Sequence, residues 1–302
     1  KGIEMSTEIT VATENGMSMS EMMGVSVGEG GKKSSSLARM TQIHSGIMGS
    51  MDVGGKTIKT EVIPSGAYKL DLGNGKIAYS TNPQIRVFAM RQQWTRWDSD
   101  SSQMQKTVLS VDLKGDLKDN TGGFNIGRPS GYVEDWENLP QATKELMRQV
   151  KRTKVVFGTV TIADAVDESG ATLSDVGTDV PFILDVKNRD SIKALDGAVK
   201  AIQRKNALPI QYKLDLSADQ HTLPTGNTYS SMIIGVGGKV EIAESDNDVL
   251  RGFFEWITWS NGYVLDQWSS KNTGGSVDPA MSKIISETMT DTDFVSVEGA
   301  AV

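Results

Sequence analysis

Residues 82–113 read NPQIRVFAMRQQWTRWDSDSSQMQKTVLSVDL, and this stretch decides which fold and which chemistry the sequence predicts. In an extended strand, alternate side chains point to opposite faces. Ile85, Val87 and Ala89 would then face a core. The opposite face would carry alternating cations, polar groups and flat rings, namely Arg86, Phe88, Met90, Gln92, Trp94 and Arg96.

The polar turn DSDSS at 98–102 predicts that the chain folds back into a second strand over 106–113, which makes a long hairpin. A face of guanidinium groups and aromatic rings suits unpaired nucleic acid, because rings stack on bases while cations contact phosphates. The same pattern also fits an amphipathic hairpin whose Trp and Phe side chains belong to the core, with Arg at its rim. The stretch alone leaves both interpretations open.

The composition is that of an ordinary globular protein. The chain has 302 residues, of which 38% are hydrophobic and 23% charged, so it is long enough to bury a full core. No apolar run approaches the roughly 18 residues that a membrane span requires, and no signal peptide is visible. We therefore expect a chain that is intracellular or carried inside a particle, without membrane contact.

Charge is distributed unevenly along the chain. The net charge is −7, but residues 241–302 hold eleven acidic and three basic residues, a net charge of −8. The preceding 240 residues are close to neutral, at +1. Within them, residues 141–154 carry five cations against the single acid Glu145. We expect a near-neutral body with local basic patches and a strongly acidic end.

The chain is predicted to have three parts. Residues 1–36, rich in Ser, Gly and Met, indicate a flexible N-terminal arm, 37–268 a single domain, and 269–302 a flexible acidic tail. Asn188 and Asp190 are suited to cap a helix that starts beside them. The helices are expected near 139–151, 189–205 and 246–268, and further strands near 57–63, 67–72, 76–79, 153–162, 180–187, 209–216 and 228–242.

The sequence offers little for catalysis. It has no cysteine and only two histidines, His44 and His221, which excludes thiolate chemistry and histidine-rich metal sites. Residues 49–57, GSMDVGGKT, are similar to a phosphate-binding loop, but the spacing is one residue too long and a strand-like segment follows where a helix is needed. We therefore expect a protein that is not an enzyme and that needs no metal or cofactor.

Six segments, taken in their order along the chain, resemble one family. They are SSSLARMTQIHS (34–45), NPQIRVFAMRQQWTRW (82–97), GRPSGY (127–132), VVFGTVT (155–161), PFILDVKNRDSIKALDG (181–197) and LPTGNTYS (223–230). This succession resembles the single-stranded DNA-binding proteins of tailed bacteriophages, particularly those of marine phages. The resemblance implies an OB-like β-barrel and binding of single-stranded DNA without sequence preference. It also implies a role in DNA replication or recombination in the cytoplasm of an infected bacterium.

The end of the chain carries a second resemblance. Phage and bacterial single-stranded DNA-binding proteins commonly end in an acidic tail with a terminal phenylalanine, and DTDF at 291–294 is similar in type. The residues VSVEGAAV follow, so Phe294 is not terminal. The resemblance implies that Asp291, Asp293 and Phe294 contact a phage polymerase, helicase or recombinase.

The sequence thus predicts an α+β, mostly β protein: an OB-like β-barrel with helical insertions that coats single-stranded DNA, with self-association left open. Two alternatives remain: a phage structural protein for virion assembly, and a replication or recombination accessory protein that acts through protein contacts. The DNA is expected to contact seven cations (Arg86, Arg91, Arg96, Lys106, Lys151, Arg152 and Lys154) and three rings (Phe88, Trp94 and Trp97).

Overall fold

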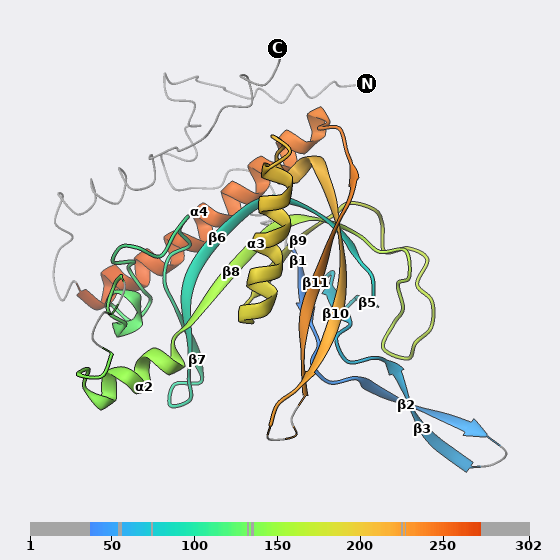
Figure 1. Ribbon diagram of the computed structural model, residues 1–302, viewed down its shortest axis with the longest axis horizontal. Helices are drawn as coiled ribbons and strands as arrows, with labels where there is room; N and C mark the ends of the chain where they lie inside the picture. Colours follow the sequence, from blue (N-terminus) through green and yellow to red (C-terminus); the bar gives the residue numbers. More distant parts are fainter. Residues whose placement is uncertain are drawn as a thin grey trace, which may run out of the picture. The chain divides into compact units, whose positions relative to one another are not determined.

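The longest strand, β6 (Gln84–Asp98), runs through the middle of a large twisted sheet (Figure 1). The computed structural model describes residues 37–272, apart from 54, 55, 74, 132, 134, 135, 225 and 227. Around β6 lie β1 (Ala38–Gln42), β4 (Tyr68–Asp71), β5 (Ile77–Ser80), β7 (Gln103–Lys106), β8 (Lys151–Thr161), β9 (Val180–Val186), β10 (Tyr212–Thr222) and β11 (Thr228–Lys239).

These nine strands follow the order β11-β10-β6-β8-β9-β1-β4-β5, and β7 pairs with the far end of β6. The neighbouring strands pair antiparallel, except that β1 and β9 are parallel. A separate two-stranded sheet joins β2 (Ile47–Val53) to β3 (Lys56–Ile63) and extends from the body (Figure 1). The described helices are α2 (Gln141–Gln149), α3 (Arg189–Gln203) and α4 (Glu244–Asn272), with short 3-10 turns η1 (Asn125–Gly127) and η2 (Pro209–Gln211).

Helices α3 and α4 cover opposite faces of the sheet. The apolar stripe of α3, including Leu195 and Ile202, packs with Val87, Val156 and other residues in the larger core cluster. On the other face, α4 packs through residues such as Phe253 and Ile257 in a second cluster that includes Ala89, Val155, Phe157 and Ile183. We call these two faces the α3 side and the α4 side of the sheet.

A β-bulge interrupts β6 at Phe88. Val87 pairs with Gly158 of β8 and Ala89 pairs with Phe157, so Phe88 is an extra residue without a partner opposite it. Gly158 is needed at this point, because a Cβ atom built on it would lie 2.1 Å from the carbonyl oxygen of Arg86. An extra residue in one strand reverses which side the later side chains face relative to the earlier ones.

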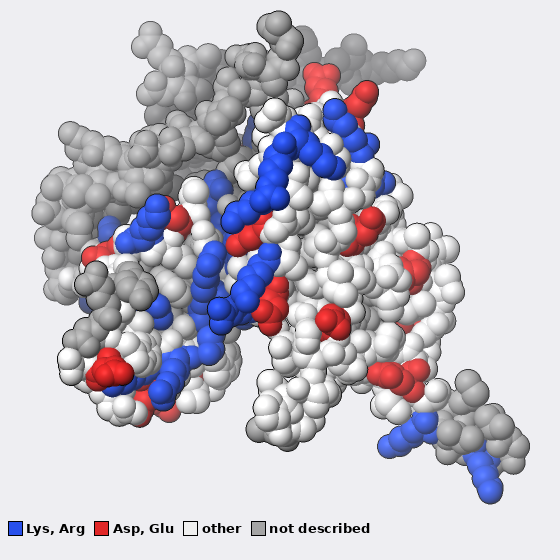
Figure 2. Space-filling model, viewed as in Figure 1, with Lys and Arg blue, Asp and Glu red and all other residues white. Residues whose placement is uncertain are grey.

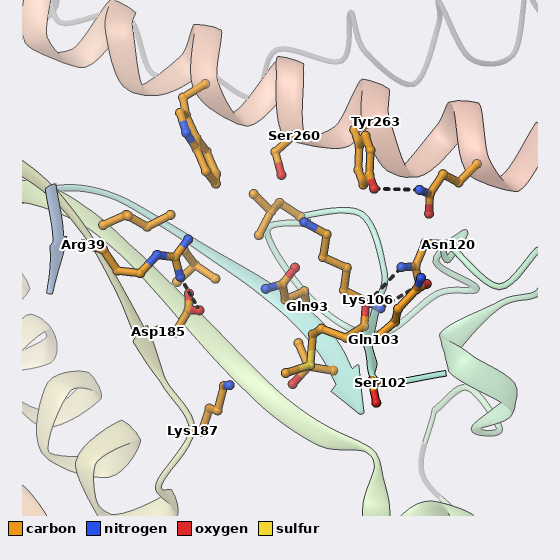
Figure 3. A pocket seen from close by; sticks show the side chains of 17 residues that line it. Arg39, Gln93, Ser102, Gln103, Lys106, Asn120, Asp185, Lys187, Ser260 and Tyr263 are labelled. Atoms are coloured by element: carbon orange, nitrogen blue, oxygen red, sulfur yellow. Dashed lines mark hydrogen bonds and ion pairs between the residues drawn. The ribbon is translucent and has the colours of Figure 1, made fainter. Parts of the chain in front are cut away.

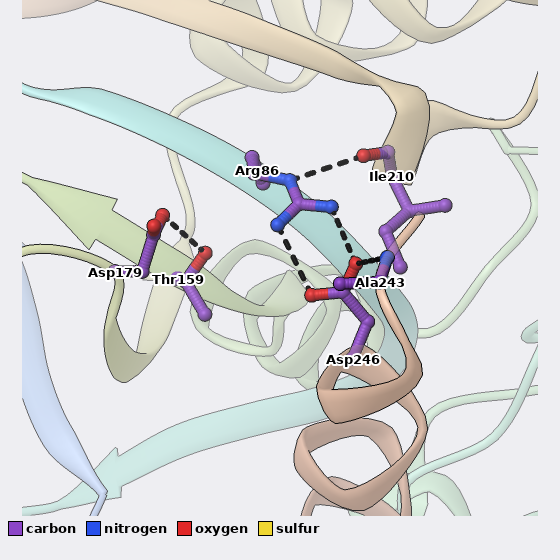
Figure 4. Close-up of polar contacts among 6 residues, drawn as sticks. All are labelled: Arg86, Thr159, Asp179, Ile210, Ala243 and Asp246. Atoms are coloured by element: carbon purple, nitrogen blue, oxygen red, sulfur yellow. Dashed lines mark hydrogen bonds and ion pairs between the residues drawn. The ribbon is translucent and has the colours of Figure 1, made fainter. Parts of the chain in front are cut away.

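Helix α4 is tied to the sheet where it begins (Figure 4). Both terminal nitrogens of Arg86 donate to the carboxylate of Asp246, at 3.1 and 2.8 Å, and Arg86 Nε donates to the carbonyl of Ile210 at 3.2 Å. Burial opposes ionisation of Asp246, but hydrogen bonds from Arg86 and from the Ala243 amide outweigh it and hold the pKa of Asp246 below its ordinary value.

The far end of α4 is held by the segment that follows β7. Asn261 exchanges two side-chain hydrogen bonds with the backbone of Leu109, at 2.7 and 3.1 Å. The Trp268 indole and the Lys271 ammonium donate to backbone carbonyls of Gly123 and Asn120. Helix α4 therefore crosses the sheet and is held by hydrogen bonds near both of its ends.

The predicted helices are confirmed, and Asn188 caps α3 by accepting from the amides of Asp190 and Ser191. The turn at DSDSS and a hairpin of β6 are also confirmed, but the second strand is β7 at Gln103–Lys106 and not the expected 106–113. After β7 the chain bonds β6 only at isolated points, such as Ser110 with Gln92. The described strands form an open sheet whose edges, β11 and β5, do not pair with each other, so the expected OB-like barrel does not form among them. No described helix has the length and apolar character needed to cross a membrane.

Candidate nucleic-acid interface

The bulge at Phe88 places the residues of the predicted DNA-binding face on two different sides of the sheet. Arg86 and Phe88 lie on the α4 side, where Arg86 bonds Asp246 and the ring of Phe88 packs edge-on against Phe253 at 5.7 Å. Beyond the bulge, Gln92, Trp94 and Arg96 lie on the α3 side, as does Met90, which packs against the larger core cluster. The predicted alternation is correct within each half of β6 but not across the bulge.

Trp94 is the centre of the exposed part of the α3 side. It pairs directly across the strands with Arg152, and Arg96 lies two residues further along β6 on the same side. The guanidinium group of Arg128 stacks over the Trp94 ring at 4.4 Å from its centroid. Trp94 is half-buried, so its ring is fixed by packing while part of it faces solvent. One guanidinium group thus lies over the Trp94 ring, and two more belong to neighbouring strand positions on the same side.

Arg128 is positioned by a tightly bonded loop. The fully buried carboxylate of Asp119 accepts hydrogen bonds from the amides of Thr121, Gly123 and Ile126, which fold the loop around it. Burial lowers the pKa of Arg128. Its Nε atom is buried and has no hydrogen-bond partner among the described residues, which is uncommon for so strong a donor.

The other two arginines are oriented by glutamines. Arg152 Nε donates to the side-chain oxygen of Gln92 at 2.9 Å, and Arg96 Nε donates to that of Gln105 at 2.9 Å. Neither makes an ion pair with a described carboxylate, so their charge remains available to an anion.

Lysines and arginines continue from this point across the surface. Figure 2 shows them gathered in a band that runs from over α3 to the lower ends of β6 and β8 and on to α2. We call this band the basic seam. Apart from Arg91, which lies on the α4 side, the exposed or half-exposed cations on these elements are Arg96, Lys144, Arg148, Lys151, Arg152, Arg189, Lys193 and Lys200.

Arg86 and Lys154 are not available for phosphate binding, contrary to the sequence-based prediction. Arg86 is 7% exposed and fully engaged by Asp246 and Ile210. Lys154 is 6% exposed and forms an ion pair with Asp196 of α3. Phe88 is half-buried and packs against the core cluster beneath α4, on the opposite face of the sheet from Trp94. Each of these side chains has a partner that is distant in sequence.

The remaining predicted residues on the α4 side are separated from Trp94 by the thickness of the sheet. Arg91 lies over the Phe254 ring of α4 at 5.4 Å, and Lys106 lies over the Tyr263 ring at 5.6 Å. Trp97 is 59% exposed at the end of β6 and pairs with Met104. Lys151 pairs with Thr95, but it is exposed at the start of β8 and belongs to the basic seam.

Sequence reasoning missed Arg128, which lies 34 residues from Trp94 in the segment GRPSGY and carries no local sign of its contact. The predicted partner-binding residues Asp291, Asp293 and Phe294 lie outside the described residues, as does the predicted N-terminal arm. No protein-family model, curated protein or solved structure matches this chain.

Proposed function

We propose that this protein binds single-stranded DNA without sequence preference, through the α3 side of β6 and β8. The observation that carries the proposal is the half-buried ring of Trp94, with the Arg128 guanidinium group over it, Arg152 directly opposite it on β8 and Arg96 two residues along β6 on the same side. An unpaired base stacks on such a ring, while guanidinium groups contact the phosphates on either side of it.

The geometry favours single strands over duplex. In a duplex the base faces are stacked on one another, and a ring fixed in a sheet, such as Trp94, reaches only sugars and phosphates. The side chains next to Trp94 are guanidinium and amide groups that bind phosphate or any base edge, which gives little sequence preference. The basic seam supplies a path for the strand beyond Trp94, toward α2 in one direction and α3 in the other.

The sequence resemblance to phage single-stranded DNA-binding proteins supports the same proposal. Within it, the protein acts in phage DNA replication or recombination in the cytoplasm of the infected host. The acidic segment 291–294 recruits a polymerase, helicase or recombinase. These finer parts rest on the resemblance, whereas the DNA-binding surface rests on the side chains around Trp94.

A salt titration tests the proposal. The protein is titrated into a labelled 30-base oligothymidine and into a matched duplex, and binding is followed by fluorescence anisotropy over a range of salt concentrations. About five phosphate contacts should give a log–log salt slope near −3.5 on the single strand, because each contributes roughly −0.7. The single strand should bind more tightly than the duplex. Undetectable binding of the single strand at low salt would contradict the proposal.

A structural role in virion assembly is a second candidate, and the β2–β3 sheet favours it. An isolated two-stranded ribbon is only marginally stable in water, so it gains from an edge contact with another chain. Exposed Met48 and Lys56 lie on this ribbon. Light scattering over a range of protein concentrations distinguishes the two candidates: assembly without DNA that is lost when the ribbon is shortened would favour the structural role.

A further inference from the structure

A cavity of about 700 Å³ lies between α4 and the α4 side of the sheet (Figure 3). Its floor is formed by side chains of β6 and β9, including Gln93 and Asp185, and its roof by α4. Small-molecule sites typically have volumes of roughly 300–1,000 Å³. Gln93 and Trp94 are adjacent in β6, so the cavity and the proposed DNA surface lie on opposite faces of one strand.

Two largely buried polar residues turn their side chains toward this cavity and have no side-chain hydrogen bond within the described part of the chain. Gln93 is 8% exposed and Ser260 is 6% exposed, and neither side chain is hydrogen-bonded to a described residue. Their polar atoms are open to the solvent of the cavity, because Arg128 Nε alone is both fully buried and unpartnered among the described side chains. Figure 3 shows them on opposite walls, Gln93 from the sheet and Ser260 from α4. Both groups are therefore open to water, and a polar ligand can take the place of that water as their hydrogen-bond partner.

The cavity is also rich in positive charge. Arg39, Lys106 and Lys187 line it, against the single carboxylate of Asp185, which contacts Arg39 at 3.4 Å. Lys106 and Lys187 make no ion pair with a described residue. Burial lowers the pKa of Lys106, the charge of Asp185 raises it in opposition, and the charge of Arg39 lowers it further. An anion placed among these groups would relieve their repulsion.

Helix α4 contributes an aromatic wall. Trp256 and Tyr263 are seven residues apart, which is two helical turns, so both rings lie on the face of α4 that lines the cavity. Trp256 is held in place by the ring of Phe157 at 5.5 Å. The cavity therefore combines flat apolar surfaces with an uncommitted amide and hydroxyl and with a group of cations.

We propose that this cavity binds a single nucleotide, with its base against the aromatic wall and its phosphate among the cations. Gln93 and Ser260 hydrogen-bond the edge of the base, because an amide both donates and accepts. Lys106, Lys187 and Arg39 bind the phosphate. A free nucleoside monophosphate and the terminal nucleotide of a DNA strand share this chemistry. The proposal does not depend on DNA binding at Trp94.

Calorimetric titration with thymidine monophosphate tests the proposal on the full chain. One nucleotide should bind per chain, and thymidine, which lacks the phosphate, should bind roughly tenfold to a hundredfold more weakly. Gln93→Leu and Lys106→Gln should each weaken nucleotide binding by roughly tenfold or more. Lys239→Gln, which removes an exposed charge at the end of β11, is the matched control and should leave binding unchanged.

Folding is checked separately in each variant by its melting temperature. Gln93→Leu removes an amide that bonds no described residue and that is open to the solvent of the cavity, so the melting temperature should change little. If that variant fails to fold, Lys106→Gln tests the same site. Absence of nucleotide binding at millimolar concentration, or unchanged binding in folded Gln93→Leu and Lys106→Gln, would overturn the proposal.

A competition experiment distinguishes a free nucleotide from the terminal nucleotide of a DNA strand as the ligand of the cavity. Displacement of thymidine monophosphate by a 5′-phosphorylated oligothymidine, but not by the unphosphorylated strand, would assign the site to a strand end. Displacement by neither would assign it to a free nucleotide. Trp94→Ala should leave nucleotide binding intact in both cases, so failure at the DNA surface and failure at the cavity are distinguishable.

Discussion

Arg86 and Arg96 lie in the same strand, on either side of the bulge at Phe88, and their surroundings are opposite. Arg86 is buried, and its guanidinium group is fully used by Asp246 and Ile210. Arg96 is half-exposed, and Gln105 is the one described residue to which its side chain is hydrogen-bonded. The comparison shows that a cation in a strand becomes part of the core or of a binding surface according to the partner that the fold brings to it.

The same contrast is repeated on β8. Lys154 and Arg152 are two residues apart and face the same side, yet Lys154 is closed off by Asp196 of α3 whereas Arg152 is exposed. The α3 side of the sheet is therefore a core where α3 covers it, and a charged surface beyond the helix. Trp94 lies at this boundary, which is why its ring is both held in place and accessible.

The largest effect is expected from breaking the buried ion pair. Asp246→Asn leaves the Arg86 guanidinium group buried without its counter-charge, which should cost about 3–5 kcal/mol of unfolding free energy. Asp248→Asn is the control, because its ion pair with Arg251 is highly exposed and should contribute only about 0–1 kcal/mol. Urea unfolding measures both. An equal, small loss in the two variants would show that Arg86 is not a core residue.

The acid sensitivity of the protein provides a second readout of this pair. The folded-state pKa of Asp246 is lowered, so the ion pair contributes fully above the unfolded value of about 3.9 and is lost as the pH falls through the folded value. The stability of Asp246→Asn should therefore vary less between roughly pH 5 and pH 2 than that of the wild type.

A smaller effect is expected at the bulge that separates the two arginines. Gly158→Ala places a Cβ atom against the Arg86 carbonyl and should destabilise the fold by about 1–3 kcal/mol. Gly197→Ala in α3 has open space around it and should stabilise the protein by about 0.5–1 kcal/mol. Thermal unfolding compares the two. A neutral Gly158→Ala would mean that the bulge does not require glycine opposite it.

The smallest effect is expected from single exposed cations. Arg152→Gln should remove one phosphate contact and reduce the magnitude of the salt slope for oligothymidine by about 0.7, with little change in stability. Arg251→Gln is the matched substitution on α4, where the side chain is 69% exposed and lies outside the cavity lining, and it should leave the slope unchanged. Equal changes in both variants would indicate binding by overall charge rather than by the α3 side.

The sequence predicted what depends on neighbouring residues. The alternation within each half of β6, the turn at DSDSS and the Asn188 cap of α3 follow from local spacing and capping, and the structure confirms them. The bulge depends on pairing with Gly158, 70 residues after Phe88, and the burial of Arg86 depends on Asp246, 160 residues away. A pattern within one strand contains no information on such partners.

Closure of the sheet and formation of the cavity likewise depend on contacts between residues that are distant in the sequence. The alternation of a strand is the same in an open sheet and in a barrel, so the resemblance to OB-like proteins was the only basis for the barrel. The cavity joins side chains as distant as Arg39 and Tyr263. Lys106 was predicted as a DNA contact for its charge alone, and only its place beside Tyr263 shows that it faces the cavity.

The most direct test of the account is one pair of measurements on Trp94→Ala: its affinity for a 30-base oligothymidine and its free energy of unfolding. Trp259→Ala, at an exposed tryptophan of α4, is the control. We predict that Trp94→Ala loses about 1–3 kcal/mol of binding free energy, with little change in stability. A loss of roughly 3–5 kcal/mol of stability with DNA affinity intact would contradict the account, because Trp94 would then be a core residue.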